Sequence, residues 1–327
     1  MENQDEIFNS RIELTALSEA VATIKQELGK VIIGQQDTIQ MLIASMLCGG
    51  HVLIEGVPGV AKTLTAKLLA QTISVSFKRI QFTPDLMPSD VLGTSVFNPK
   101  TLEFEYKRGP IFSNLILIDE INRSPAKTQA ALFELMEEKQ VTIDGQTYPM
   151  QSPFMVLATQ NPIEQEGTYR LPEAQLDRFL MKVIVGYPEG DEEVELLKRF
   201  NYKTQKDVTD TVVSSLTKEK IIALKATIQQ IIVEDNLLKY ITTIVQATRN
   251  HKQIELGASP RASLALLHAS KAIAAINGRD FVIPEDIKAI GKVVLRHRII
   301  LSAETEMEGI TEDEVLNDLF STIEIPR

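Results

Sequence analysis

A glycine-rich run that ends in Lys-Thr carries the clearest chemistry in this sequence. Residues 56–63 read G-V-P-G-V-A-K-T, between an apolar run at 51–55 that predicts a buried strand and a helix expected over 63–72. Backbone N–H groups of such a loop can surround phosphate oxygens, and the positive end of the following helix favours an anion. Lys62 can neutralise the β- and γ-phosphates, and Thr63 can offer its hydroxyl to Mg²⁺. The loop therefore predicts a site for nucleotide phosphates.

One residue of this loop departs from the general P-loop pattern G-x-x-x-x-G-K-[ST]. Ala61 stands where the pattern has its last glycine. Because a Cβ atom disfavours a positive φ, we expect a negative φ at Ala61 and a constrained loop around it. A glycine-rich turn with an incidental Lys-Thr pair is the alternative for this segment taken alone.

Two adjacent carboxylates follow a second apolar run, at 115–118, that is typical of a strand buried on both faces. They are Asp119 and Glu120. Side chains at the carboxyl end of a parallel strand lie at the edge where open α/β sheets bind ligands. Asp119 can hold Mg²⁺, and Glu120 can polarise the attacking water in phosphoryl transfer. A solvated strand end is the alternative, which the P-loop upstream disfavours.

Three more polar residues are candidates for contacts with the transferring phosphate. Asn161 follows the strand expected over 154–158, and its amide could bond both the γ-phosphate and the water. Arg178 is either a surface arginine in an ion pair or a finger directed at a neighbouring subunit's nucleotide. Arg261 lies in the first turn of a helix expected over 260–276, where a cation opposes the helix dipole unless a phosphate or a carboxylate compensates.

The spacing of apolar residues predicts two domains. Strands that alternate with helices favour a three-layer α/β domain with a mainly parallel sheet over 1–188. After Pro188 and Gly190 the pattern is helical with no convincing strand, so we expect a smaller all-α domain over 189–327. The expected strands are 51–55, 75–82, 115–118, 154–158 and 181–185, and the expected helices are 11–29, 37–47, 63–72, one with Ser124 as N-cap and Pro125 at its first position, 191–201, 217–233, 235–249, 260–276, 284–297 and 310–321.

Two segments predict hairpins inserted into the α/β domain. In 140–149, Asp144-Gly145 separates two short β-prone runs, which suits a two-residue type I′ turn. The segment 93–106 gives a weaker signal of the same kind. Surface decoration is one interpretation of both hairpins, because connecting loops usually lie on the surface.

Composition argues against several classes of protein. The 327 residues carry 34 basic and 44 acidic side chains, a net charge of −10, which weakens any nucleic-acid interpretation. The one cysteine, Cys48, excludes an internal disulfide and a cysteine-based zinc site. The first residues lack the positive start and the apolar core of a signal peptide, and no run approaches 18 apolar residues. We therefore expect a cytoplasmic protein with no membrane insertion.

Several strings of residues together resemble the MoxR family of AAA+ ATPases. Matches spread over most of residues 11–300, and MoxR proteins usually carry alanine in the P-loop, so the departure at Ala61 supports this resemblance. The strings are V-I-I-G-Q (31–35), E-G-V-P-G-V-A-K-T (55–63), L-I-D-E-I-N-R (117–123), A-T-Q-N-P (158–162), L-P-E-A-Q-L-D-R-F (171–179), S-P-R-A (259–262) and V-L-R-H-R-I (294–299).

The resemblance implies an AAA+ type P-loop NTPase domain followed by an α-helical lid, and an enzyme that hydrolyses ATP to ADP and phosphate with Mg²⁺. It implies that Asn161 is sensor 1, Arg178 the arginine finger and Arg261 sensor 2, with Arg170 and Arg123 as rival fingers. An ion pair with a carboxylate of its own chain is the alternative for Arg123. The expected catalytic residues are Lys62, Glu120, Asn161 and Arg178, and the expected metal ligands are Thr63 and Asp119. The expected nucleotide contacts are Ile33, Gly34, Gly56, Pro58, Gly59, Val60, Ala61, Lys62, Thr63, Leu64 and Arg261.

The resemblance also implies a homo-oligomer, usually a hexameric ring, that acts as a chaperone-like motor. Such motors remodel or mature client protein complexes, metal-cofactor insertion included, often with a partner that bears a von Willebrand factor A domain. The hairpins at 93–106 and 140–149 would then face the axial pore or a client. A nucleic-acid-remodelling motor and a nucleotide-gated scaffold with little turnover are the alternatives. The charge opposes the first, and Glu120 opposes the second.

Overall fold

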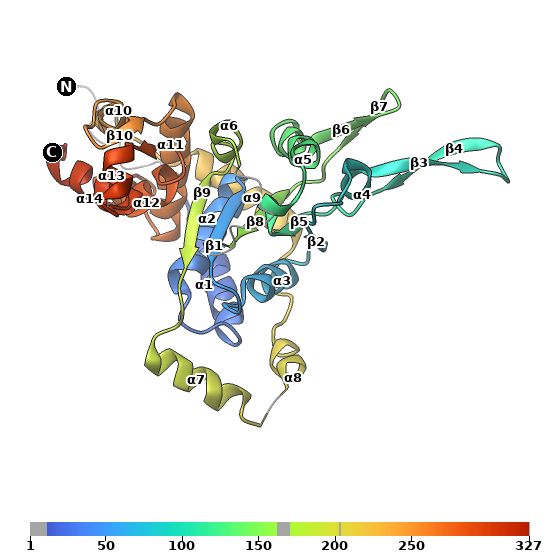
Figure 1. Cartoon of the computed structure of the whole chain (residues 1–327). Coiled ribbons are helices and arrows are strands. Elements are labelled where there is room, and N and C mark those ends of the chain that lie inside the picture. Colours follow the sequence, from blue (N-terminus) through green and yellow to red (C-terminus); the bar gives the residue numbers. More distant parts are fainter. Residues whose placement is uncertain (1–11, 162–170, 203, 327) are drawn as a thin grey trace, which may run out of the picture. The chain divides into compact units, whose positions relative to one another are not determined.

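The computed structural model of the chain describes residues 12–161, 171–202 and 204–326. The chain forms two compact units (Figure 1). We call residues 24–221 the sheet unit, and residues 222–327 together with the chain up to Thr23 the helical unit. This division differs from the boundary expected between residues 188 and 189, because the segment that follows the last strand of the sheet belongs to the sheet unit.

A five-stranded parallel sheet forms the centre of the sheet unit (Figure 1). Its strand order is β2-β5-β8-β1-β9, and each pair of neighbours is parallel. All five strands predicted from the sequence are confirmed, and their carboxyl ends meet at one edge. The strands are β1 (Val52–Gly56), β2 (Phe77–Gln81), β5 (Leu115–Asp119), β8 (Met155–Gln160) and β9 (Met181–Val185).

Helices cover both faces of this sheet. On one face, Ile116, Ile118 and Val156 share a buried core with Leu132 and Phe133 of helix α5. The intervening strand residues point to the opposite face, because successive side chains of a strand alternate. There α2 contacts β9, while α3 contacts β2 and β5. The predicted three-layer arrangement is therefore confirmed. The helices are α2 (Gln36–Cys48), α3 (Lys62–Thr72) and α5 (Ala126–Glu138), with short α4 (Pro88–Leu92), η1 (Ile121–Arg123) and α6 (Glu173–Leu176).

The start of α5 differs by one residue from the prediction. Pro125, not Ser124, is its N-cap residue, and it has an extended ψ of 152°. The buried hydroxyl of Ser124 therefore does not cap the helix as the sequence predicted.

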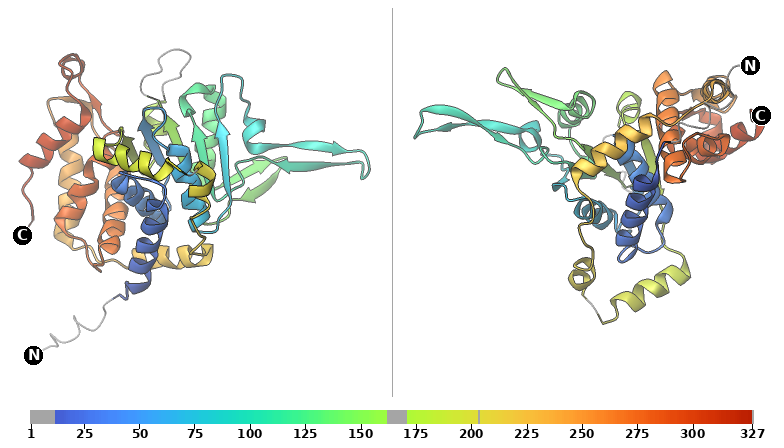
Figure 2. Two further views of the ribbon diagram at one scale, coloured as in Figure 1. Left: turned by 90° about the horizontal axis from the view of Figure 1, so that it is seen from below. Right: turned by 180° about the vertical axis from the view of Figure 1, so that it is seen from behind.

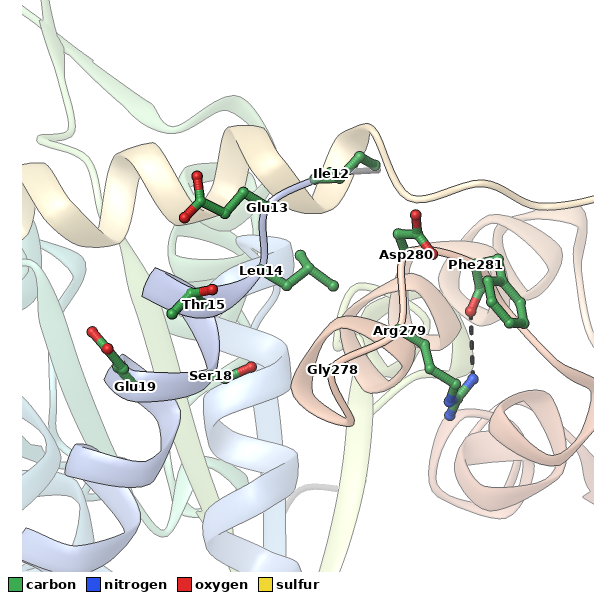
Figure 3. Close-up of a pocket in the computed structure, with 10 residues that line it drawn as sticks. All are labelled: Ile12, Glu13, Leu14, Thr15, Ser18, Glu19, Gly278, Arg279, Asp280 and Phe281. Carbon is green, nitrogen blue, oxygen red and sulfur yellow. Dashed lines mark hydrogen bonds between the residues drawn. The ribbon is translucent and has the colours of Figure 1, made fainter. Parts of the chain in front are cut away.

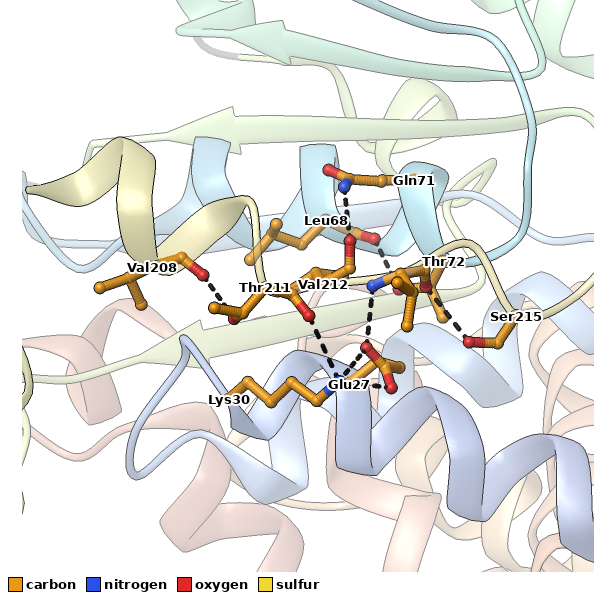
Figure 4. A network of polar contacts seen from close by, with 10 residues as sticks. Glu27, Lys30, Leu68, Gln71, Thr72, Val208, Thr211, Val212 and Ser215 are labelled. Carbon is orange, nitrogen blue, oxygen red and sulfur yellow. Dashed lines mark hydrogen bonds and ion pairs between the residues drawn. The ribbon is translucent and has the colours of Figure 1, made fainter.

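A strap of chain, residues 208–216, ties the segment beyond β9 back to the sheet unit (Figure 4). The buried carboxylate of Glu27 on α1 (Thr15–Gly29) accepts hydrogen bonds from Val213 N at 3.0 Å and Lys30 Nζ at 2.6 Å. Backbone N–H groups of the strap also donate to Thr72 O at the end of α3. These bonds explain why α7 (Gly190–Phe200) and α8 (Gln205–Thr209) belong to the sheet unit.

Two hairpins extend side by side from the sheet unit, as Figures 1 and 2 show: β3 (Gly93–Asn98) with β4 (Glu103–Arg108), and β6 (Gln140–Ile143) with β7 (Gln146–Pro149). Both were predicted from the sequence. Asp144 and Gly145 have φ values of 51° and 78°, as a type I′ turn requires. The Tyr106 and Tyr148 rings lie 4.7 Å apart, and Ser95 Oγ donates to the Asp144 carboxylate. Tyr148 and the turn residue Asp144 thus join the β6–β7 hairpin to the base of the β3–β4 hairpin.

The helical unit corrects one prediction, because it contains a small antiparallel sheet of β10 (Ile254–Leu256) and β11 (Ile300–Leu301). Strands of two or three residues are too short for alternation to reveal. Among the described residues, no helix combines the length and the apolar character needed to cross a membrane. The helical unit contains α10 (Asp235–Arg249), α11 (Pro260–Ile276), α12 (Pro284–Leu295), α13 (Ala303–Met307) and α14 (Glu312–Thr322), and most of α9 (Lys218–Gln229) belongs to it as well.

A hollow of about 630 Å³ lies in the helical unit, between the start of α1 and the loop 278–281 (Figure 3). Glu13, Glu19 and Asp280 contribute carboxylates to its lining. The Arg279 guanidinium is instead committed to buried Asp286, with two contacts of 2.6 and 2.7 Å. Arg279 therefore serves the packing of α12 and leaves the hollow acidic.

Candidate nucleotide-binding site

The phosphate loop joins β1 to α3 at the carboxyl edge of the sheet. Gly59 and Ala61 have φ values of 88° and 57°. The negative φ expected at Ala61 is therefore wrong, because Ala61 adopts the left-handed conformation that the pattern's glycine would favour. The small side chain accepts this conformation at a cost of about 1–2 kcal/mol. At Gly56 a Cβ atom would lie 2.5 Å from Val185 O, so the neighbouring strand requires glycine there.

Lys62 lies over the loop, where its Nζ donates to Gly56 O at 2.6 Å. Partial burial lowers the pKa of Lys62, and the carboxylates of Asp119, Glu120 and Glu55 act in the opposite direction. Removal from water strengthens the attraction between a lysine and an anion. The lysine is thus placed to exchange its backbone partner for a phosphate oxygen. Thr63 follows it in the first turn of α3.

Asp119 and Glu120 lie at the end of β5, next to the end of β8. Thr159 Oγ1 donates to Asp119 Oδ1 at 3.2 Å and accepts from Glu120 N at 3.0 Å, so one hydroxyl positions both residues. Asp119 is buried. Glu120 has φ 58° and ψ 53°, a left-handed conformation that is uncommon for a residue with a long side chain. Backbone strain of this kind concentrates at functional sites.

Two residues on β2 that were not predicted from the sequence bind these carboxylates. Arg79 Nε donates to Asp119 Oδ2 at 2.5 Å, and Gln81 Nε2 donates to Glu120 Oε2 at 2.7 Å. The only signal in the sequence was the polar-apolar-polar order of residues 79–81, since residues two apart share one face of a strand.

Arg123 is one of the rival fingers expected from the sequence. Its Nε lies 3.2 Å from Glu120 Oε2, so it pairs with a carboxylate of its own chain. This is the alternative that the sequence analysis left open for Arg123. Arg170, the other rival, lies outside the described residues.

Arg178 lies farther from the loop, against α5. Its Nη1 donates to Phe133 O at 2.7 Å and pairs with the Glu137 carboxylate. Glu134, Glu137 and Arg178 line a hollow of about 360 Å³. In the single chain the guanidinium is therefore held by its own subunit. Whether Arg178 serves a neighbouring nucleotide stays a prediction.

Asn161 and Arg261, the last two polar residues predicted for the site, lie in different units of the chain. Asn161 directly follows β8 at the carboxyl edge and is partly buried. Arg261 belongs to the helical unit, in the first turn of α11, where its backbone N–H donates to the N-cap Ser259 Oγ at 3.2 Å. The predicted helix start at Arg261 is confirmed, and its role as a nucleotide sensor stays a prediction.

A hollow of about 400 Å³ adjoins the phosphate loop within the sheet unit. Some of the expected nucleotide contacts contribute to its lining, namely Ile33, Gly34, Gly59, Val60, Ala61 and Leu64, whereas Pro58 is exposed in the loop. That these residues bind a nucleotide stays a prediction. Sequence reasoning missed a second set of lining residues, which come from the end of β9 and from α7. These are Ile184, Val185, Gly186, Tyr187, Pro188, Leu196 and Phe200.

The donor set at the loop fits Mg²⁺. That ion is usually held by one or two protein oxygens, with phosphates and waters completing its octahedron, and Asp119 and Thr63 supply such oxygens. Within the described ranges, no three Asp, Glu, His or Cys side chains gather into a metal site of their own. The Arg79 guanidinium on Asp119 shows that this carboxylate already attracts a cation.

Comparisons with known proteins agree with this geometry. The model of the ATPase family associated with various cellular activities (AAA) matches residues 51–181, and an AAA lid domain model matches residues 246–319. The parallel sheet with its phosphate loop, followed by the helical unit, thus defines an AAA+ ATPase fold with a predominantly α-helical lid region.

Similar proteins narrow the class. The uncharacterised Bacillus subtilis protein YeaC is 46% identical over 92% of this chain and 93% of its own length. Chaperone MoxR1 of Mycobacterium tuberculosis is 41% identical over 96% of this chain and 84% of its own length. A solved structure from Cytophaga hutchinsonii, described as a candidate ATPase, is 44% identical with a TM-score of 0.88 and covers 95% of this chain and 97% of its own. The chain belongs to the MoxR family of AAA+ ATPases.

Proposed function

We propose that this chain binds Mg-ATP and hydrolyses it to ADP and phosphate. The observation that carries the proposal is the convergence of Lys62, Thr63, Asp119 and Glu120 on one edge of the sheet, beside a hollow with an apolar lining. A loop with backbone N–H groups at the start of α3 favours the β- and γ-phosphates. The hollow accommodates the base, with Ile33 and Gly34 on its wall.

Each residue of the site has a separate role in the proposed hydrolysis. Lys62 neutralises the β- and γ-phosphates. Thr63 and Asp119 would hold the metal ion, which would withdraw charge from the phosphate oxygens. Glu120 accepts a proton from the attacking water as it approaches the γ-phosphate, and Asn161 orients that water. For this step Glu120 must turn away from Gln81 and Arg123, which hold its carboxylate here.

Phosphate release by wild-type protein and by Glu120→Gln tests this function. The amide cannot accept the proton, so we expect hydrolysis to fall about 10²–10⁴-fold while ATP affinity stays within a factor of about three. Glu255→Gln, at an exposed position in β10, is the matched control and should hydrolyse ATP normally. Hydrolysis by Glu120→Gln at the rate of the control would show that the water is activated elsewhere.

The same proposal extends to assembly. We infer a homo-oligomeric ring, hexameric as in the family that the chain belongs to, in which Arg178 exchanges Glu137 for the γ-phosphate of the adjacent subunit. A guanidinium suits the spread negative charge of a transferring phosphoryl group. The support is the position of Arg178 three residues before β9 and its guanidinium, which is only partly buried.

We further propose that the ring is a chaperone-like motor acting on protein complexes, metal-cofactor insertion among its tasks, with a von Willebrand factor A domain protein as partner. One relative is itself named a chaperone. The exposed rings of Phe97 and Phe104 on the β3–β4 hairpin support a protein contact. Affinity capture with Glu120→Gln and ATP, compared with Lys62→Ala, tests this role: clients should be retained only by the variant that binds ATP without hydrolysing it.

A further inference from the structure

Arg79 occupies the position beside Asp119 where the proposed function requires a metal ion. Its Nε lies 2.5 Å from Asp119 Oδ2, while Thr159 Oγ1 contacts the other carboxylate oxygen. The Asp119 side chain is 10% exposed, whereas that of Arg79 is 53% exposed. A buried carboxylate is thus paired with a partly exposed arginine, whose side chain can move into solvent.

The same arginine is linked to the second carboxylate of the site. Arg79 Nη2 donates to Gln81 Oε1 at 3.3 Å, and Gln81 Nε2 donates to Glu120 Oε2 at 2.7 Å. Gln81 lies directly opposite Asp119 in the β2–β5 register, which places both polar side chains of β2 beside the end of β5. The four residues therefore form a continuous chain of contacts from Asp119 to Glu120.

We propose that Arg79 competes with Mg²⁺ for Asp119, so that metal binding displaces the arginine and Arg79 sets the metal requirement of nucleotide binding. This inference rests on the proposed function of the site. A guanidinium and a divalent cation repel each other strongly at a few ångströms away from bulk water, so one carboxylate does not hold both. In the free protein, Arg79 supplies the positive charge that burial of Asp119 demands.

Displacement of Arg79 also has a consequence for Glu120. When the guanidinium leaves Asp119, it withdraws its contact from Gln81 Oε1, and Gln81 is then free to reorient. The bond that holds the Glu120 carboxylate is loosened by the same event. Arg79 is therefore a positioning residue. When a metal ion binds Asp119, the movement of Arg79 changes the hydrogen bonding of Glu120, which accepts the proton from the water.

The test replaces Arg79 by glutamine and its neighbour Lys78 by glutamine as the matched control. Lys78 is exposed and alternates to the other face of β2, so both variants remove one positive charge from the same strand. The probe is Mn²⁺, followed by electron paramagnetic resonance of the free ion, with the full chain in excess over ADP. This readout needs no turnover.

We expect Arg79→Gln to tighten Mn²⁺ half-saturation about threefold to tenfold relative to wild type, because a partly exposed charge pair is no longer broken. Lys78→Gln should shift it less than about twofold, since its charge is separated from Asp119 by solvent. Equal half-saturation in the two variants would overturn the competition. Weaker binding in Arg79→Gln would overturn it too, because Arg79 would then orient Asp119 for the metal.

Two further measurements keep the outcomes distinguishable. Binding of a fluorescent ADP in EDTA should be similar in wild type and both variants, which shows that the phosphate loop is intact. If wild type binds no nucleotide with or without metal, the proposed function itself fails. If Arg79→Gln does not fold, Arg79→Met replaces it: an uncharged side chain likewise leaves Asp119 without a competing cation and should also tighten Mn²⁺ binding.

Discussion

At the carboxyl edge of the sheet, the charged groups needed for chemistry are already held by neighbours: Lys62 by a backbone carbonyl, Asp119 by Arg79 and Glu120 by Gln81. The outer half of the β3–β4 hairpin is the reverse case. Phe97 and Phe104 contact each other at 5.4 Å between ring centroids, yet Phe104 is 74% exposed. In the proposed function a ligand would replace the contacts within the chain at the edge, whereas the hairpin leaves apolar surface that the described residues do not cover.

The base of the hairpins lies between these extremes. Tyr106 and Tyr148 are partly buried against each other, and the Arg108 guanidinium lies 5.7 Å from the Tyr148 ring centroid. Burial raises the pKa of Tyr106, and its neighbour Tyr148 adds to that effect. The contrast teaches that the base holds the hairpins together through packing, while the outer half adds little to folding. Substitutions in the carboxyl edge, in the base of the hairpins and in the outer half of the β3–β4 hairpin should therefore have different effects.

The largest effect is expected for Arg178→Ala. If Arg178 acts on the adjacent subunit's nucleotide, its loss should lower ATP hydrolysis by about 10³–10⁵-fold while ATP binding stays intact. Mixing this variant with Lys62→Ala should restore part of the hydrolysis, because one chain supplies the phosphate site and the other the arginine. Phosphate release by the mixture, with mixed rings shown by co-purification, is the measurement. A mixture without activity would mean that Arg178 does not act in trans.

The ion pair between Glu27 and Lys30 lies away from the carboxyl edge, so its loss should affect stability and not ATP hydrolysis. Burial alone would raise the pKa of Glu27, but hydrogen bonds from Lys30 and Val213 N outweigh burial and leave the pKa below its ordinary value. Its stabilising contribution is therefore present above the unfolded pKa and is lost as the pH falls through the folded pKa. Glu27→Gln should lower the unfolding free energy at pH 7 by about 1–3 kcal/mol.

Urea unfolding at pH 7 and in acid checks this prediction. The difference between wild type and Glu27→Gln should shrink below the folded pKa of the carboxyl group. Glu19→Gln, at an exposed position on the same helix, is the control and should unfold like wild type at both values. An equally stable Glu27→Gln would show that the strap is held by its other contacts alone.

A smaller, local effect is expected at the base of the hairpins. Tyr148→Ala removes the ring that packs on Tyr106, and we expect the junction to lose about 1–2 kcal/mol. Hydrogen exchange should become faster in both hairpins, with ATP affinity unchanged. Tyr202→Ala, at a 93% exposed position, is the control. Weaker ATP binding in Tyr148→Ala would contradict the separation between the hairpins and the edge.

The smallest effect is expected in the outer half. Phe104→Ser should change the unfolding free energy and the ATP affinity by less than about 0.5 kcal/mol, since the ring is already solvated. Thermal unfolding and a nucleotide titration measure both. Loss of cooperative unfolding in this variant would show that the outer half contributes to the core.

Features with local signals were predictable from the sequence. Asp144 and Gly145 adopt the positive φ values that such a pair favours, and the strand preceding Asp119 reads as an apolar run. Partners from distant parts of the chain were not predictable. Arg79 is 40 positions from Asp119, and nothing in a single strand says which neighbour it will meet.

Ala61 shows a different limit of prediction. Intrinsic preference favours a negative φ for alanine, but the path from β1 into α3 requires the left-handed conformation. The geometry of the loop thus outweighs the intrinsic preference of alanine. The small strands β10 and β11 escaped prediction for a third reason, because their pairing depends on how the helical unit packs.

The central claim is that the loop at 56–63 holds the phosphates of ATP, and the affinity of Lys62→Ala for ATP tests it most directly. Lys67→Ala, exposed on the same helix α3, is the matched control. In a titration with a fluorescent ATP analogue, Lys62→Ala should lose on the order of 100-fold in affinity, while Lys67→Ala should bind like wild type. An unchanged affinity in Lys62→Ala would mean that the phosphates bind elsewhere, and it would contradict the assignment of the site.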